Sequence, residues 1–301
     1  MPIFKISGTQ LKKLNSLLLD KEKNLQILVE TNLFEVLDII FLATEYTTTF
    51  GGRIDSLAVD TNGSPVIIEY KRNKNDNVIN QSLSYLKWLK SQKQGFFEKL
   101  MIDKLGKDKA DQIKLDWSNP RVICIAESYS KFDIDTAEVV PLRIELMKYR
   151  YYEDGIFSLE SVNIQETITS SPIIPSSISG EKPFTNVVNT VDSLLANASE
   201  DIKSVFSELR ERIVALDDAV TENPTSIYVG YRMNKNFAEI HINQNKLKIH
   251  LRPIDYIDPK GMVEKIPDGY NWTMDRRVYL KSINDMEYIF GLIEQSYKNV
   301  I

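Results

Sequence analysis

Two acidic residues and a lysine lie close together in the segment GGRIDSLAVDTNGSPVIIEYK, residues 51–71. Asp55 precedes Glu69 by fourteen residues, and Tyr70 alone separates Glu69 from Lys71. Two carboxylates and a backbone carbonyl make a hard oxygen site that suits Mg²⁺, an ion that keeps several waters when proteins bind it. A lysine beside such a site can orient an attacking water and offset charge that develops on phosphorus. These residue types together suit metal-dependent hydrolysis of a phosphodiester bond.

The surrounding sequence predicts two strands joined by a short turn. Residues 53–59 and 65–71 read as strands, and the Asn-Gly pair between them has strong turn chemistry. Side chains two positions apart share one face of a strand, so Glu69 and Lys71 are expected to point together. If the two strands pair, Asp55 comes to lie near Glu69 on that face.

The pattern of Asp55, thirteen residues, Glu69, Tyr70 and Lys71 resembles the active-site motif of the PD-(D/E)XK nuclease superfamily. Ile54 stands where that family has proline. The resemblance implies a restriction-endonuclease-like mixed sheet flanked by helices and an Mg-dependent deoxyribonuclease. It also implies that Asp55, Glu69 and the Tyr70 carbonyl hold Mg²⁺ or Mn²⁺, while Lys71 assists the water.

Neighbouring segments extend this resemblance over most of residues 20–165. Gln81 and Tyr85, in QSLSY, match a Gln-x-x-x-Tyr element of RecB-type exonuclease domains, and their spacing puts both side chains on one helix face. The segment LQILVETNLFEVL resembles the first helix of NucS-like endonuclease domains, where Glu30 matches a glutamate that often joins the site. RVICIAESYS and IELMKYRYYEDG look like that group's later strand and closing segment. Glu30 and Gln81 are therefore expected to support the site.

Several residues have more than one interpretation. Glu30 has two interpretations: it binds the metal or positions a water, or it is a solvated residue of the helix. Glu45, at the end of an apolar strand, is another acid that could lie near the metal. Tyr85 is a candidate for nucleic-acid contact, although an aromatic residue at helical spacing from Trp88 more often belongs to a core. The whole fold could also be an idle nuclease module that binds nucleic acid or a protein partner.

Basic residues follow the lysine. Residues 71–93 hold six basic residues and one acidic residue, and Arg72 and Lys74 are expected to contact a phosphate backbone unless they only solvate a loop. His241 and His250 lie nine residues apart on expected adjacent strands. Because no third ligand has a suitable spacing, the sequence does not favour a histidine metal site there.

The elements that must position these residues fall into two expected domains, residues 1–165 and 187–301, joined by a linker at 166–186 that is rich in Ser, Thr and Pro. The first is expected to be α/β, and the second a smaller α+β domain for substrate choice, a partner or dimerisation. The expected helices cover residues 25–37, 76–93, 191–216 and 285–298. The expected strands cover residues 40–46, 53–59, 65–71, 121–126, 226–233, 237–242, 246–251 and 278–281, and residues 144–151 and 157–162 read as a helix or a strand pair.

Sequence motifs in the C-terminal half carry a second resemblance. LRERIVALDDAV, YVGYRMNKNFAEIHI and DRRVYLKSINDMEYI resemble a domain of unknown function often found behind nuclease-like domains. Some members are labelled "predicted transport protein", a label that fits poorly with a chain that lacks a membrane span. Aromatic and basic residues of this half could bind single strands, although a packed sheet face explains them better.

Composition limits the class of protein. The chain has 301 residues, 43% hydrophobic and 26% charged, as in an ordinary folded protein. Its net charge of −5 argues against coating nucleic acid with the whole surface, and a single cysteine excludes disulfides and cysteine-based zinc sites. No apolar stretch reaches the length of a membrane span. We therefore expect a cytoplasmic protein with no membrane partner. The resemblance to the nuclease superfamily implies DNA rather than RNA as the substrate, and homodimerisation stays open.

Overall fold

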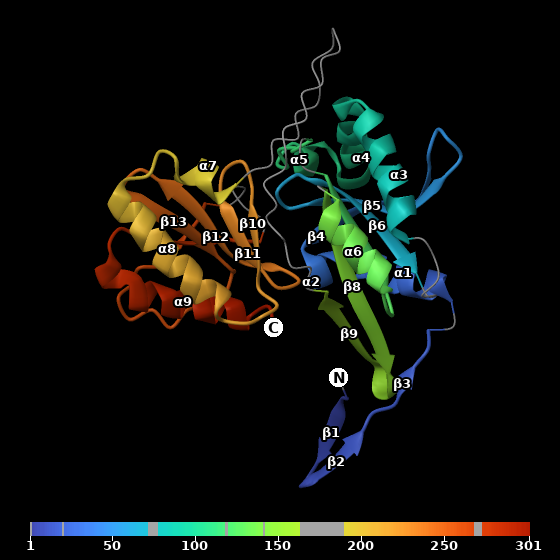
Figure 1. The fold of residues 1–301 in the computed structure, drawn as a ribbon, viewed down its shortest axis with the longest axis horizontal. Helices are drawn as coiled ribbons and strands as arrows, with labels where there is room; N and C mark the ends of the chain where they lie inside the picture. Colours follow the sequence, from blue (N-terminus) through green and yellow to red (C-terminus); the bar gives the residue numbers. More distant parts are fainter. Residues whose placement is uncertain are drawn as a thin grey trace.

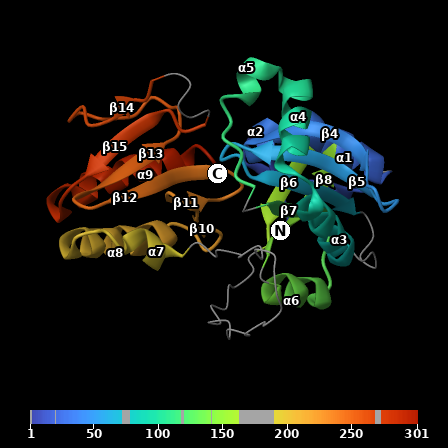
Figure 2. The same ribbon diagram turned by 90° about the horizontal axis from the view of Figure 1, so that it is seen from above.

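The computed structural model describes residues 2–19, 21–71, 78–117, 120–140, 142–162, 190–267 and 273–301. The expected linker at 166–186 and the expected DNA contacts Arg72 and Lys74 lie outside these residues. The N-terminal and C-terminal halves each contain a sheet, and the two halves lie side by side (Figures 1 and 2). No helix of the described residues is long and apolar enough to cross a membrane.

The sheet of the N-terminal half is mixed, which confirms the expected α/β class. Its strands run in the order β3-β8-β7-β6-β5-β4, with β9 paired to β8. The pairs β6–β7 and β7–β8 are parallel, and the other pairs are antiparallel. The strands are β3 (Ser16–Leu17), β4 (Ile39–Thr47), β5 (Arg53–Asp60), β6 (Pro65–Lys71), β7 (Arg121–Ala126), β8 (Arg143–Tyr152) and β9 (Ile156–Ser161).

Helices cover both faces of this sheet because its central strands are apolar on both sides. On β7, Val122 and Cys124 pack into the cluster that includes Leu86 and Met101, whereas Ile123 packs on the opposite face. The helices on the first face are α3 (Val78–Ser91), α4 (Gln94–Leu105), α5 (Lys107–Ala110) and α6 (Lys131–Val139). Those on the second face are α1 (Glu22–Thr31) and α2 (Leu33–Leu37) (Figure 1).

The C-terminal half is α+β, as expected, with an antiparallel sheet in the order β10-β11-β12-β13-β15-β14. Two long helices, α8 and α9, pack against one face of this sheet (Figure 1). The strands are β10 (Thr221–Pro224), β11 (Val229–Arg232), β12 (Asn236–Asn243), β13 (Lys246–Leu251), β14 (Glu264–Lys265) and β15 (Arg276–Leu280). The helices are α7 (Val191–Leu195), α8 (Glu200–Val214) and α9 (Met286–Lys298), with 3₁₀ turns at Ile283–Asp285 here and at Glu153–Gly155 in the N-terminal half.

The structure differs from the expected elements in identifiable ways. The helix expected over 25–37 is broken at Asn32 into α1 and α2, and the helix expected over 191–216 is broken into α7 and α8. The second break follows from a new cap, since Ser199 Oγ accepts a hydrogen bond from the Ile202 N–H at 3.3 Å. Residues 143–161 form a strand pair, and the sequence analysis missed α4, α5 and α6.

Short strands were also missed. The hairpin of β1 (Phe4–Ser7) and β2 (Gln10–Lys13) is exposed along its length and projects from the molecule (Figure 1). The expected strand over 226–233 is shorter, and β10 and β14 had no expected counterpart. Strands of two to four residues carry too little periodicity to be recognised in a sequence.

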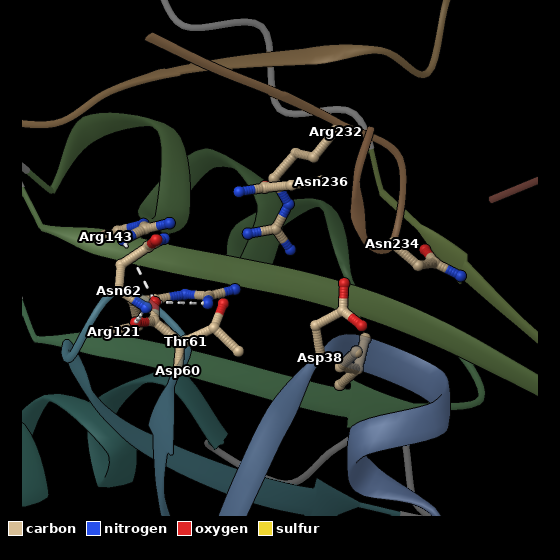
Figure 3. A pocket seen from close by; sticks show the side chains of 10 residues that line it. Asp38, Asp60, Thr61, Asn62, Arg121, Arg143, Arg232, Asn234 and Asn236 are labelled. Carbon is tan, nitrogen blue, oxygen red and sulfur yellow. Dashed lines mark hydrogen bonds and ion pairs between the residues drawn. The ribbon is translucent and has the colours of Figure 1, made fainter. Parts of the chain in front are cut away.

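Side chains from both halves line a small polar pocket (Figure 3), and ion pairs beside it connect the halves. Arg121 donates to both oxygens of Glu145 at 2.8 Å and to Asp60 Oδ2 at 2.9 Å. From the C-terminal half, Arg232 donates to Glu145 Oε2 at 2.7 Å, and Arg252 donates to Asp38 Oδ2 at 2.6 Å. Removal of one charge here would leave a buried opposite charge with one partner fewer, at a cost in stability.

Candidate functional site

The hairpin of β5 and β6 determines where the first two candidate residues lie. Leu57 is paired with Ile67 and Ser56 with Ile68, so the next position of each strand brings Asp55 beside Glu69. The turn that joins the strands is held by the Asp60 carboxylate. Its Oδ1 accepts hydrogen bonds from the N–H groups of Asn62 and Ser64 at 3.0 and 2.9 Å.

Gly63 fits this turn for two reasons. Its φ of +85° is one that side chains other than glycine rarely adopt, and a Cβ there would lie 1.9 Å from the Lys114 carbonyl oxygen. The turn is therefore both formed locally and packed against the segment after α5. This packing fixes the register that brings the two acids together.

Hydrogen bonds join Asp55 and Glu69 directly. The Asp55 N–H donates to Glu69 Oε1 at 3.2 Å, and the Tyr70 N–H donates to Asp55 Oδ2 at 3.0 Å. Glu69 is completely buried, and its Oε2 has no hydrogen-bond partner among the described residues. A buried carboxylate oxygen without a donor requires a proton or a cation.

Burial raises the pKa of both acids. It raises the pKa of Glu69 to about 9, helped by the neighbouring negative charge of Asp55. It also raises the pKa of Asp55, in opposition to the hydrogen bond from the Tyr70 N–H and the charge of Lys71. The pair would therefore hold a proton at neutral pH. A divalent cation placed between the acids would replace that proton, so the residues fit an Mg²⁺ or Mn²⁺ ion.

Lys71 lies on the same strand face as Glu69, at the entrance to the acids. With Asp55 it lines an open pocket of about 520 Å³. The remaining lining residues are Glu22, Thr47, Gly51, Arg53, Gln81 and Tyr85. The predicted acid pair and lysine are thus brought together beside a pocket.

Glu22 is an acid that the sequence analysis missed. It lies in the first turn of α1, lines the pocket, and places Oε1 3.7 Å from Lys71 Nζ. Its charge acts on both carboxyls and raises the pKa of Asp55 and of Glu69. The available signal was its place in the first turn of the helix, where acids are favourable.

Glu30 lies elsewhere, which corrects its predicted role. It accepts hydrogen bonds from Ser56 Oγ at 2.6 Å and from Gln26 Nε2 at 2.8 Å. Ser56 Oγ also lies 3.3 Å from the hydroxyl of Tyr70, whose side chain belongs to the cluster on the α1 face of the sheet. Because successive strand residues face opposite sides, Glu30 is separated by the sheet from the carboxylates of Asp55 and Glu69.

Gln81 and Tyr85 lie together on α3, as their spacing predicts. Gln81 Nε2 donates to the Tyr85 hydroxyl at 3.0 Å, and the Arg53 N–H donates to the same oxygen at 3.1 Å. Tyr85 is 4% exposed and its ring stacks on Phe50, although it also lines the pocket beside Asp55 and Lys71. Its expected contact with nucleic acid stays a prediction. Trp88 is equally buried, in agreement with the core interpretation.

Glu45 is occupied by two cations. Its carboxylate accepts a hydrogen bond from Lys23 Nζ at 2.5 Å and forms an ion pair with Arg53 Nη1 at 2.8 Å. Its backbone has a φ of +48°, which is uncommon for a residue with a side chain. These contacts make Glu45 a partner of the pocket's cations rather than a third acid beside Asp55 and Glu69.

Similar sequences cover both halves of the chain. Residues 191–300 match a family described as a domain of unknown function, DUF5655, in agreement with the resemblance of the C-terminal half. An uncharacterized protein of Haemophilus influenzae is 28% identical over 308 residues, which cover 99% of this chain and 100% of that protein.

Two solved structures show a distant similarity. The crystal structure of a repair endonuclease from Pyrococcus abyssi matches with a TM-score of 0.28 and 17% identity, over 44% of this chain and 50% of that chain. A structure described as an EndoMS-dsDNA2 complex matches with a TM-score of 0.27 and 18% identity, over 48% and 49% of the respective chains. This chain therefore spans about half of either solved chain.

Proposed function

We propose that the protein is a metal-dependent deoxyribonuclease that uses Asp55, Glu69 and Lys71 to hydrolyse a phosphodiester bond. The observation that carries this proposal is the hydrogen-bonded pair of Asp55 and Glu69, in which Glu69 Oε2 is buried and receives no hydrogen bond from any described residue. The same residues carry the resemblance to the PD-(D/E)XK superfamily. A structural ion pair would account for Lys71, but it would not account for a completely buried Glu69 beside a half-buried Asp55.

Each residue has a separate role in the proposed reaction. Asp55 and Glu69, with the Tyr70 carbonyl, would hold Mg²⁺ or Mn²⁺, which when bound supplies charge stabilisation and a more acidic water. Lys71 orients the attacking water and offsets charge on the phosphate. Glu22 keeps the Lys71 ammonium beside the pocket through its 3.7 Å contact. Gln81 binds the Tyr85 hydroxyl and so fixes one wall of the pocket.

DNA is the proposed substrate, and the pocket offers two cations to its backbone. Lys71 lies at the acids, and Arg53 lines the same pocket. Such contacts position a phosphate without reading a base sequence. The C-terminal half is proposed to supply substrate choice, a partner or a dimer contact.

The test is cleavage of single-stranded and double-stranded DNA by the purified protein with Mg²⁺ or Mn²⁺. We expect the native chain to cut, and Asp55→Asn and Lys71→Ala to lose at least ~100-fold of the rate. Equal cutting by the variants would disprove the assigned roles. Tight, salt-sensitive DNA binding without cleavage would instead favour an idle nuclease module.

A further inference from the structure

Three metal-binding side chains gather on the sheet of the C-terminal half. Glu239 and His241 lie on β12, and His250 lies on the neighbouring β13 directly opposite Glu239. One ligand atom from each residue lies within 4.8 Å of the other two. Within the described parts of the chain, no other trio of His, Cys, Asp or Glu is arranged in this way.

The alternation of the strands explains why these residues meet. Ala238 and Ile240 pack in the core formed with α8 and α9, so Glu239 and His241 point to the opposite face. His250 shares that face because it is paired with Glu239. Glu239, two positions before His241, is the third ligand that spacing between the histidines did not reveal.

Hydrogen bonding within the trio is incomplete. Glu239 is 2% and His250 is 4% exposed, yet His250 Nδ1 and His241 Nε2 are buried and have no hydrogen-bond partner in the described parts of the chain. His250 Nδ1 lies 3.8 Å from Glu239 Oε2, which is too long for a hydrogen bond. Two atoms that share one tetrahedral zinc ion stand about 3.4 Å apart, so a small movement would let both bind it.

We propose that Glu239, His241 and His250 bind a Zn²⁺ ion. Two imidazoles and one carboxylate form a ligand set that zinc prefers and that Mg²⁺ does not. Asn236 Nδ2 donates to Glu239 Oε1 at 3.1 Å and so orients the carboxylate as outer contacts do in metal sites, while Oε2 lies 3.8 Å from His250 Nδ1. The ring of Tyr228 packs 5.2 Å from His241, and its buried hydroxyl has no hydrogen-bond partner among the described residues.

This proposal is independent of the proposed nuclease activity, and direct zinc binding tests it. The full chain would be stripped with a chelator and titrated with Zn²⁺ against a chromophoric zinc indicator. We use Asp55→Asn combined with Glu69→Gln as the background, so that the acid pair cannot contribute. One zinc per chain is expected, and His241→Ala and His250→Ala should each weaken binding by at least about 10–100-fold.

Two further measurements guard against unfolded variants. Lys246→Ala, a substitution on β13 outside the trio, should bind zinc as tightly as the background chain. Co²⁺ in the same background chain should give the intense visible absorption of a tetrahedral site, and Zn²⁺ should abolish that absorption. Absence of tight zinc binding, octahedral cobalt spectra, or unchanged affinity in the folded histidine variants would overturn the proposal.

Discussion

The Asp55 N–H donates a hydrogen bond to Glu69 Oε1 at 3.2 Å, while the other oxygen of Glu69 is buried and has no donor within the described part of the chain. The backbone of Asp55 therefore stabilises the Glu69 carboxylate in part. The negative charge of the two carboxylates is still not balanced by cations beside them. Lys71 approaches from the pocket but is also paired with Glu22. This shortage of positive charge is the physical basis for the first prediction.

Glu69→Gln should stabilise the metal-free protein, and the gain should grow with pH. Burial raises the pKa of Glu69 from 4.5 to about 9, so between these values the folded chain binds a proton that the unfolded chain has released. The stability that the bound proton contributes to the native chain is therefore fully present below pH 4.5. It is lost as the pH rises through the folded-state pKa of about 9. Chemical denaturation at pH 8 should show a gain of ~1–3 kcal/mol for the variant.

Thermal denaturation of the native protein and of Glu69→Gln with added metal shows whether Glu69 is a metal ligand. Millimolar Mg²⁺ or Mn²⁺ should raise the melting temperature of the native chain at pH 8 and leave Glu69→Gln nearly unchanged, because the ion binds only the folded native site. Near pH 4 the two proteins should have the same stability. An equal response to metal would show that Glu69 is no ligand.

Two acids on α1 should behave differently when each is replaced by alanine. Glu22→Ala removes a half-exposed charge near Asp55 and Lys71, so we expect several-fold weaker Mn²⁺ affinity with little change in stability. Glu30→Ala removes the carboxylate that accepts from Ser56 Oγ at 2.6 Å and from Gln26 Nε2 at 2.8 Å, so we expect ~1–2 kcal/mol lower stability and unchanged Mn²⁺ affinity. Free Mn²⁺ measured by electron paramagnetic resonance reports the affinity. The reverse pattern would return Glu30 to the site.

The positions of Glu22 and Glu30 relative to the site could not be predicted from the sequence, whereas the hairpin could. The hairpin was predictable because an Asn-Gly turn and strand alternation are local, and they place Asp55 beside Glu69 without further information. The face of α1 that meets the site depends on how the helix crosses the sheet, which no local pattern encodes. Glu239 was missed for a similar reason, since only the register of β12 against β13 brings it to His250.

The ion pair of Asp38 and Arg252 should hold the two halves together. Asp38 has a φ of +55°, which asparagine tolerates, so Asp38→Asn removes the charge and keeps the backbone. Arg252 and Lys235 then lose a buried carboxylate, and we expect ~2–4 kcal/mol lower stability with separate unfolding of the halves. Calorimetry would resolve two transitions.

Asp154→Asn is the matched control for this substitution. Asp154 also has a positive φ, +61°, and pairs with Lys5 at 2.8 Å, but both side chains are exposed. Because solvent screens that pair, no measurable change is expected. A single, unshifted transition for Asp38→Asn would mean that the buried pair does not couple the halves.

Gly52→Ala should disturb the pocket wall, because a Cβ there would lie 2.7 Å from Tyr85 Cε1. Tyr85 cannot easily move, since its hydroxyl is held by Gln81 and by the Arg53 N–H. We expect a loss of about 1–3 kcal/mol in the free energy of unfolding, measured by urea denaturation.

Gly95→Ala is the control. A Cβ at Gly95, in α4, would meet no described atom within 4 Å, so this substitution should be neutral or slightly stabilising. In a Tyr85→Ala background the cost of Gly52→Ala should vanish, and an undiminished cost there would place the clash elsewhere.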